Sequence, residues 1–264
     1  MDFTKEQYDR LREFYSDMEI ELMEPSFVKP LFEHLYDFTV EQETVYVQTF
    51  ETVDEDGKVV TEEKETVLTE EQAEHLEKLD LDAIGSMERT PNATHETASK
   101  FITLKLALGP NTAQVTISCN WKKLPTVRSY DIMAFACSGF HYFWGANNFT
   151  AYVKGDGKIT GSYNENCSEA KIKQGVGAGV SVKLPANATS SIYSFMQCSF
   201  AVPAGATVVN GTYQHCTSNI SLSDSMKYNI KSSATSMGGV LDFTSSSVAN
   251  KYDSTGGLSV SDFI

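Results

Sequence analysis

The sequence predicts a mainly β protein: an antiparallel β-sandwich or jelly-roll-like domain, preceded by a small N-terminal segment of helices and a β-hairpin. Three observations predict this class. After residue 99, about ten short strand-like runs follow one another with turn residues and no helical pattern between them. Hydrophobic residues make up 41% of the chain, which is enough for a packed core. Acidic residues are concentrated in the first hundred positions.

This uneven charge divides the chain. Residues 1–100 contain 27 acidic and 9 basic residues, residues 101–264 contain 8 and 12, and the net charge is −14. Such a shift indicates a boundary between regions of different surface chemistry. We therefore predict an acidic α+β segment at residues 1–82, a polar linker at 83–98 and a β-sandwich domain at 99–264.

Two helices are predicted at the N-terminus. Thr4 and Gln7 have the spacing of a capping box, and Tyr8, Leu11 and Tyr15 then recur at helical spacing, which predicts a helix over residues 5–18. A second, shorter helix is expected over residues 26–38, with Pro30 in or near its first turn.

A β-hairpin is predicted between residues 43 and 68, where the hydrophobic period changes to two around a turn at residues 54–58. The acidic residues of that turn lack the spacing of a calcium loop, so we predict a turn and no metal site. Thr69 and Gln72 form a second capping-box pattern, which predicts a helix to about residue 79.

The C-terminal domain contains alternating runs without the crossover helices that parallel strands would need. We expect strands at residues 101–106, 113–121, 131–140, 158–163, 176–184, 191–202, 207–213, 223–230, 240–243 and 258–263.

Several segments resemble a known group of proteins. The run from Trp121 to Asp131 is similar to the central motif of uncharacterised secreted proteins of Gram-positive bacteria of the clostridial type. The segment from Thr212 to Leu258 is similar to the C-terminal end of those proteins. Residues 8–23 and 43–69 resemble their acidic N-terminal part. The resemblance implies export and a β-sandwich, and it implies no activity. This chain departs from the family in lacking a visible leader and in carrying several cysteines.

The sequence argues against nucleic-acid binding and against a membrane-spanning segment. No Lys/Arg stripe is present that would displace counterions from nucleic-acid phosphates, so no nucleic-acid binding is predicted. The longest apolar run, residues 132–137, is too short to span a membrane. The acidic amphipathic start at Met1, taken alone, is typical of a cytosolic protein, whereas the resemblance implies export. We expect an extracellular or cell-surface location, with a virion as the alternative.

Five cysteines, all in the C-terminal domain, form no CxxC pair, so no zinc site is predicted. Three of them lie in apolar runs, where a buried free thiol is expected. An exported chain could form one or two disulfides, and their connectivity stays open. The five residues are Cys119, Cys137, Cys167, Cys198 and Cys216.

Two groups of residues are candidate binding sites. Arg128 is predicted to form a structural clamp with a carboxylate, such as Asp131, at the corner after Pro125; a carboxylate or sugar ligand for Arg128 is the alternative. Tyr142, Trp144 and Asn148 combine aromatic rings with an amide, as in sugar sites, and the alternative is a strand end whose rings complete the core.

No catalytic residue, cofactor or metal is predicted. The five histidines show no paired spacing and no Gly-x-Ser-x-Gly elbow is present. His215 and Cys216 are neighbours, but adjacent strand residues point to opposite faces, so they are expected to cooperate only where the strand is broken.

These observations favour an extracellular, non-catalytic surface, matrix or filament-type structural or binding protein. Its expected partners are further copies of itself, joined through β edges, or glycans. Three alternatives stay open: a carbohydrate-binding adhesin-like module, a phage virion structural protein and a glycan hydrolase.

Overall fold

The fold was obtained as a computed structural model. The structure describes residues 3–32, 38–53, 59–69, 71–72, 75, 95–109, 112–138, 142–143, 149–201, 206–231, 240–253 and 257–263. The helix predicted up to residue 79 lies mostly outside these residues, although both hydrogen bonds of the Thr69–Gln72 capping box are present.

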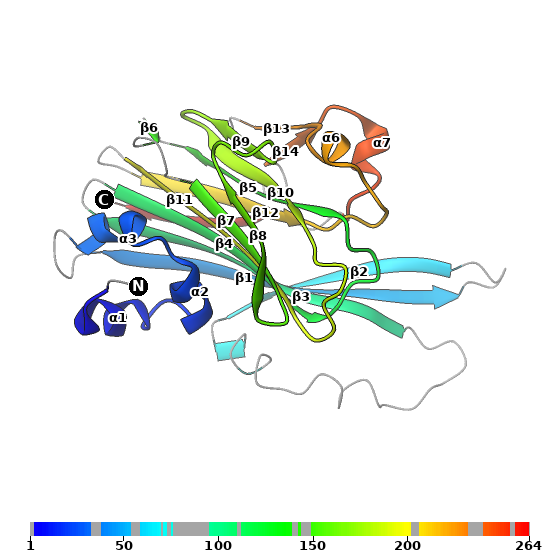
Figure 1. Ribbon diagram of the computed structural model, residues 1–264, viewed down its shortest axis with the longest axis horizontal. Coiled ribbons are helices and arrows are strands. Elements are labelled where there is room, and N and C mark those ends of the chain that lie inside the picture. The colour runs from blue at the N-terminus through cyan, green and yellow to red at the C-terminus, as the bar shows by residue number, and fades with distance from the viewer. Residues whose placement is uncertain are drawn as a thin grey trace.

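Two antiparallel sheets dominate the fold (Figure 1). The large sheet has the order β2-β1-β3-β4-β11-β7-β8, with β6 also paired to β11, and the small sheet has the order β15-β12-β5-β10-β9. The strands of the large sheet are β1 Thr39–Val53, β2 Val59–Leu68, β3 His95–Gly109, β4 Thr112–Lys123, β6 Tyr142–Phe143, β7 Phe149–Gly155, β8 Lys158–Asn164 and β11 Ile192–Ala201. Those of the small sheet are β5 Tyr130–Ser138, β9 Ala170–Lys173, β10 Gly177–Lys183, β12 Ala206–Gln214 and β15 Leu258–Phe263.

Short helices and a two-stranded sheet complete the molecule. The helices are α1 Lys5–Leu11, α2 Asp17–Leu22, α3 Pro25–Phe32, α6 Leu222–Ser225 and α7 Ser246–Ala249, and the extra strands are β13 Tyr228–Ile230 and β14 Leu241–Phe243. No helix within the described residues is long and apolar enough to cross a membrane. The predicted mainly β, sandwich-like fold with short N-terminal helices is confirmed.

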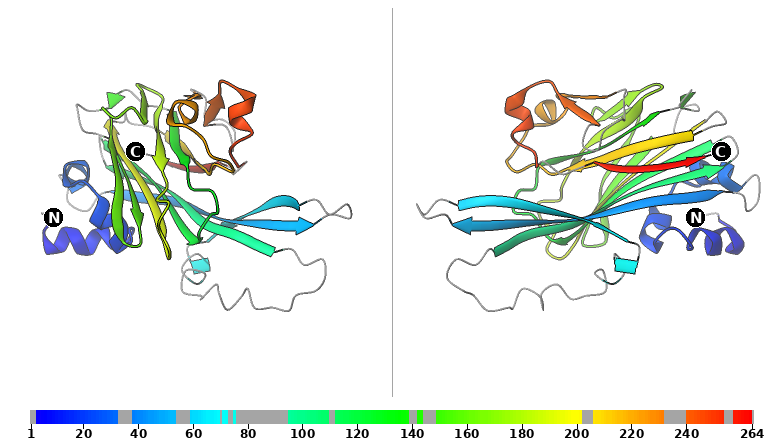
Figure 2. Two further views of the ribbon diagram at one scale, coloured as in Figure 1. Left: turned by 45° about the vertical axis from the view of Figure 1, so that its right-hand side comes forward. Right: turned by 180° about the vertical axis from the view of Figure 1, so that it is seen from behind.

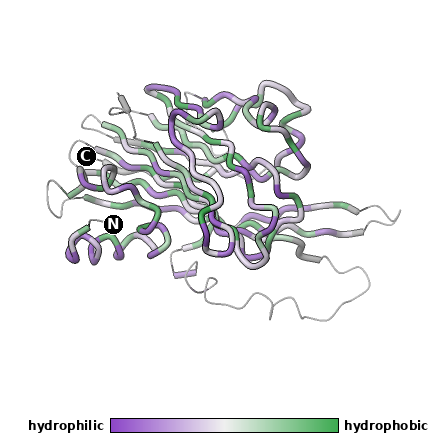
Figure 3. The backbone as a smooth tube through the Cα atoms, viewed as in Figure 1, coloured by the Kyte–Doolittle hydropathy of each residue, from purple (hydrophilic) through white to green (hydrophobic). Residues whose placement is uncertain are grey.

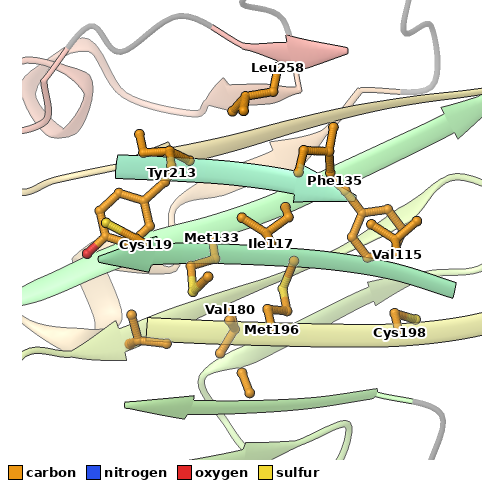
Figure 4. Packing of buried hydrophobic residues seen from close by; sticks show 14 of the residues in the cluster. Val115, Ile117, Cys119, Met133, Phe135, Val180, Met196, Cys198, Tyr213 and Leu258 are labelled. Carbon is orange, nitrogen blue, oxygen red and sulfur yellow. The ribbon is translucent and has the colours of Figure 1, made fainter. Parts of the chain in front are cut away.

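The main core lies between the two sheets. Figure 4 shows Val115, Ile117 and Cys119 of β4 packed near Met133 and Phe135 of β5. These residues occupy alternate positions of their strands, because successive strand side chains point to opposite faces. The alternation is visible along the strands in Figure 3. A glycine brings the sheets close together on β12, where a Cβ at Gly211 would lie 2.9 Å from a methyl carbon of Leu104.

Two further layers cover the outer faces of the sandwich. Helices α1–α3 lie on the large sheet, where Leu11, Ile20 and Val28 pack against Ala107 and Phe195 (Figure 1). On the other side, the segment from α6 to α7 packs on the outer face of the small sheet. The molecule therefore has four layers, and both sheets are covered on both faces over much of their area.

The N-terminal hairpin is part of the large sheet. β1 pairs with β3 from Thr39↔Leu108 to Glu51↔His95, so residues 95–98 of the predicted linker begin a core strand. The hairpin extends past the sandwich (Figure 2), and Val47 is the last buried position among the β1 residues up to Thr52. We call its outer part, residues 48–53 and 59–64, the β-arm. The division at residues 82 and 98 stays a prediction, but the hairpin and the sandwich share one sheet.

The predicted helix over residues 5–18 is wrong in its extent. α1 ends at Leu11 and α2 begins at Asp17, because Ser16 accepts a hydrogen bond from the Glu19 amide and forms a second capping box. The next helix, α3, runs from Pro25 to Phe32, so it begins one residue earlier than predicted and Pro30 lies in its second turn. Residues 33–37 of the predicted helix lie outside the described residues.

Most predicted strands are confirmed within four residues, including the two strands of the hairpin between residues 43 and 68, whose predicted turn at 54–58 lies outside the described residues. The strand predicted over residues 223–230 is wrong, because Ser221 caps the short helix α6 and only Tyr228–Ile230 is extended. The strand β7, which pairs with β11 inside the large sheet, has no counterpart in the prediction.

Candidate functional site

A groove lies between the helical layer and the outer face of the large sheet. One side is formed by the chain from Arg12 to Glu19, and the floor is formed by side chains of β1, β3, β4 and β11. Its volume is about 420 Å³, within the range usual for small-molecule sites.

Three hydroxyl groups form one row across the floor. Thr44, Thr103 and Ser118 are register partners on β1, β3 and β4. Side chains that face each other across antiparallel strands lie within about 5.5 Å. The Oγ1 atoms of Thr44 and Thr103 are 3.0 Å apart and hydrogen-bonded. We call these three residues the hydroxyl row.

An aromatic–amide row runs beside it. Phe101, Asn120 and Tyr193 are register partners on β3, β4 and β11 and all line the groove. Asn120 is half-buried and stands between Phe101 and Tyr193 in this row. The floor therefore places an amide between two aromatic rings.

The α1–α2 turn is held over this floor by a buried ion pair. The Lys105 ammonium lies 2.8 Å from the Glu19 carboxylate and donates to the Phe14 carbonyl oxygen at 2.7 Å. The Glu19 carboxylate also accepts from the Ser16 amide. One carboxylate thus caps α2 and ties the helical layer to β3.

The charged groups around the groove are paired with one another, whereas the hydroxyl of Tyr15 is not. Tyr15 is 4% exposed, and its hydroxyl lacks a hydrogen-bond partner among the residues that the structure describes. Burial raises the pKa of Tyr15, so the hydroxyl keeps its proton. The ion pairs are Arg12–Asp17, Arg10–Glu13 and Lys105–Glu19.

A second polar cluster is buried inside the sandwich around Asp131, at the start of β5. Its carboxylate accepts from the Tyr213 hydroxyl at 2.6 Å and from the Cys216 amide at 3.0 Å, and it lies 3.0 Å from His215 Nδ1. Burial by itself would raise the pKa of Asp131, but His215, Tyr213 and the Cys216 amide outweigh it and lower this pKa.

Lys100 and Asp253 extend this cluster as a fully buried ion pair. Asp253 also accepts from the His215 amide at 2.9 Å. Burial would lower the pKa of Lys100, but Asp253 raises it. Glu63 of the β-arm lies near the same charges, and burial together with Asp253 raises its pKa to about 7.

His215 and Cys216 do meet on one side, because β12 ends at Gln214 and the extended pattern stops there. Ligand atoms of Asp131, His215 and Cys216 lie within 4.8 Å of one another, so these three residues could hold a metal ion by distance. However, burial and Asp131 raise the pKa of the Cys216 thiol well above its usual value, and His215 Nδ1 is already bonded to Asp131. The cluster has the chemistry of a closed hydrogen-bond network.

Arg128 binds backbone carbonyls at the predicted corner. It donates to the carbonyl oxygens of Pro125 at 3.2 Å and Ala186 at 3.1 Å, and also to that of Ala188. The expected pairing of Arg128 with Asp131 is not formed, because Asp131 bonds to the cluster around His215.

The predicted sugar-binding residues lie largely outside the part of the chain that the structure describes. Trp144 and Asn148 lie outside the described residues, and for Tyr142 only the backbone pairing of β6 with β11 is seen. Two nearby rings are accounted for: Phe149 is in the core, and the Tyr152 hydroxyl donates to Glu24 at 2.6 Å.

All five cysteines are free thiols, and Cys119, Cys137 and Cys198 are buried as expected. Cys216 is buried as well, and Cys167 is half-buried. Burial raises the pKa of the Cys119 thiol and of the Cys137 thiol, so both stay protonated in the core.

The groove residues escaped prediction because they are ordinary strand positions. Phe101, Thr103 and Asn120 alternate with core residues, which identifies one shared outer face on each strand. The strand register and the position of the helical layer then decide which of these residues surround one space.

The sequence matches no protein-family model and none of the curated proteins. Among solved structures, it has a weak similarity to the KRT10-binding region domain of the pneumococcal serine rich repeat protein PsrP. The TM-score is 0.26 at 14% sequence identity, covering 66% of this chain and 88% of that chain. A similarity of this size supports no functional transfer.

Proposed function

We propose that this protein is a non-catalytic, extracellular surface-binding module whose ligand occupies the groove between the helical layer and the large sheet. The observation that supports this proposal is that side chains from four adjacent strands line the groove beneath the α1–α2 turn, which the buried Lys105–Glu19 ion pair holds in place. A preformed site binds without a large ordering cost.

The polar cluster supports binding over catalysis. The ionisable groups around Asp131 are bonded to one another inside the sandwich, and the Cys216 thiol keeps its proton. A nucleophile or general base needs a lowered or matched pKa and access to a substrate. Placement at the cell surface rests on the resemblance of the sequence to secreted proteins.

The test is a binding screen with a blocked groove. Purified protein is offered immobilised polysaccharides and extracellular matrix proteins at equilibrium, and each ligand is checked by mass spectrometry after incubation. Asn120→Arg fills the floor of the groove, and Asn229→Arg makes the same change at an exposed position of β13.

Binding that is lost in Asn120→Arg, kept in Asn229→Arg and leaves the ligand intact supports the proposal. Conversion of any ligand by the wild-type protein contradicts a non-catalytic role. Binding that survives Asn120→Arg contradicts the groove as the site.

A further inference from the structure

We infer that the groove binds an uncharged saccharide, with the hydroxyl row and the aromatic–amide row as its floor and the Tyr15 hydroxyl as a buried hydrogen-bonding group. The inference rests on the proposed function and specifies its ligand class.

The first argument is charge. Each ion pair beside the groove consists of two protein groups that neutralise each other, and Lys105 has both its carboxylate and a carbonyl as partners. An anionic or cationic ligand would have to break such a pair or enter without a counter-charge. Charged ligands are therefore disfavoured, because an unpaired charge in a partly buried site is costly.

The second argument is the pattern of the floor. Neutral sugar-binding sites need apolar contact for the C–H face of a ring and hydroxyl or amide groups for its hydroxyls. Phe101 and Tyr193 supply rings on either side of Asn120, and Thr103 and Ser118 supply hydroxyls on the neighbouring row. Adjacent strands are about 4.8 Å apart, so a row across three strands spans about 10 Å, the scale of a disaccharide.

The third argument is Tyr15, which lines the groove and whose buried hydroxyl has no partner in the described part of the chain. A buried hydroxyl without a hydrogen bond destabilises the folded state, because it has lost its water. A ligand hydroxyl would restore that bond. The hydroxyl thus costs stability in the free protein and stabilises the complex.

The experiment measures binding and stability on the same variants. Isothermal titration calorimetry uses a panel of neutral di- and trisaccharides of glucose, galactose and N-acetylglucosamine, together with uronic-acid and sialylated counterparts. Tyr15→Phe removes only the buried hydroxyl. Tyr8→Phe is the matched control, since Tyr8 belongs to the same helical layer and does not line the groove.

We expect a neutral saccharide to bind, with affinity reduced three- to tenfold by Tyr15→Phe and unchanged by Tyr8→Phe. The urea midpoint of Tyr15→Phe, measured without ligand, is expected to be equal to or above that of the wild type. A purely structural hydroxyl would lower the midpoint and leave the affinity unchanged, and that result overturns the inference.

The remaining outcomes separate the two proposals. If a charged saccharide or a protein binds the wild type and this binding is lost in Asn120→Arg, the neutral-saccharide inference is overturned and the groove remains the binding site. If no ligand binds, or if binding is unchanged by both Tyr15→Phe and Asn120→Arg, the groove is not a binding site and the proposed function is contradicted.

Discussion

Asp131 shows how one carboxylate organises the interior of the sandwich. It is fully buried and joins β5 to β12 through Tyr213, and to the chain after β12 through His215 and Cys216. Hydrogen bonds to an ionised group are stronger than those between neutral groups. The residue therefore replaces ordinary strand pairing at the point where β12 ends.

The lowered pKa of Asp131 predicts acid sensitivity. A carboxylate whose pKa is lower when folded stabilises the protein above its unfolded pKa of about 3.9, and this stabilisation is lost as the pH falls through the folded pKa. We expect the unfolding free energy to fall below about pH 4. Asp131→Asn should lower it by about 1.5–3 kcal/mol at pH 7 and flatten the acid dependence.

Urea unfolding between pH 2.5 and 7 measures both effects. Asp242→Asn on the exposed position of β14 is the matched control and should follow the wild-type curve. An Asp131→Asn protein with the full acid dependence of the wild type would contradict the assignment.

The ion pair of Lys100 and Asp253 predicts a second residue-scale effect. Both side chains are at most 2% exposed, so Lys100→Met leaves a buried carboxylate without its counter-charge. Such a change costs about 3–5 kcal/mol. The double variant Lys100→Met/Asp253→Asn should recover much of the loss, because the asparagine oxygen still accepts from the His215 amide. A double-mutant cycle in urea measures the coupling, and additive single losses would contradict it.

At the scale of elements, the helical layer depends on both apolar packing and charge. Leu11 and Ile20 are fully buried in the contact with the large sheet. Beneath the layer, buried polar atoms of Gln114 and Thr116 lack hydrogen-bond partners among the described residues. A buried polar atom without a partner lowers the free energy of unfolding, so the helical layer is held less tightly than the main core.

The Glu19–Lys105 ion pair is therefore expected to determine how often the helical layer separates from the large sheet. Glu19→Gln keeps an acceptor for the capping box of α2 and removes the negative charge beside Lys105. Hydrogen–deuterium exchange should accelerate in α1 and α2 by tenfold or more, while β4 and β11 keep their protection.

Lys154 and Glu21 provide the comparison, because the Glu21 side chain of that pair is 60% exposed. Glu21→Gln should change exchange in α2 far less, since exposed ion pairs contribute little. Equal acceleration in the two variants would show that burial of the pair is not the cause.

At the scale of the whole molecule, the outer edges of the large sheet determine whether copies can join. β2 is an edge strand with three acidic residues and a lysine at positions 62–65, and β7 has a register shift against β8 at Val153/Lys154. Charged side chains and bulges block edge-to-edge pairing. The net charge of −14 adds repulsion between copies.

We therefore predict a monomer for the wild type and association once two of the four charged side chains at positions 62–65 of β2 are removed. Glu62→Thr/Lys64→Thr removes one exposed charge of each sign, so the net charge is unchanged. The edge keeps Glu63 and Glu65 but gains two β-favouring threonines in place of charged side chains. Sedimentation velocity from 5 to 200 μM, about the range of ordinary preparations, should show a single species for the wild type and larger species for the variant. Concentration-dependent polymers of the wild type would support assembly through β edges instead.

The sequence by itself determined the mainly β class, most of the strands, the hairpin and the capping boxes at Thr4 and Thr69. These features depend on residues close together in the chain, because strand alternation and helix capping are local. The split of the first helix by Ser16 and the helix α6 were missed where a local cap competed with a longer periodic pattern.

Only the tertiary structure decided that the acidic hairpin shares a sheet with the sandwich, that Asp131 bonds to His215 rather than to Arg128, and that Phe101, Asn120 and Tyr193 line one groove. These relations join residues far apart in the sequence. Strand order and register set them, and both follow from how the whole core packs, which the pattern of a single segment does not encode.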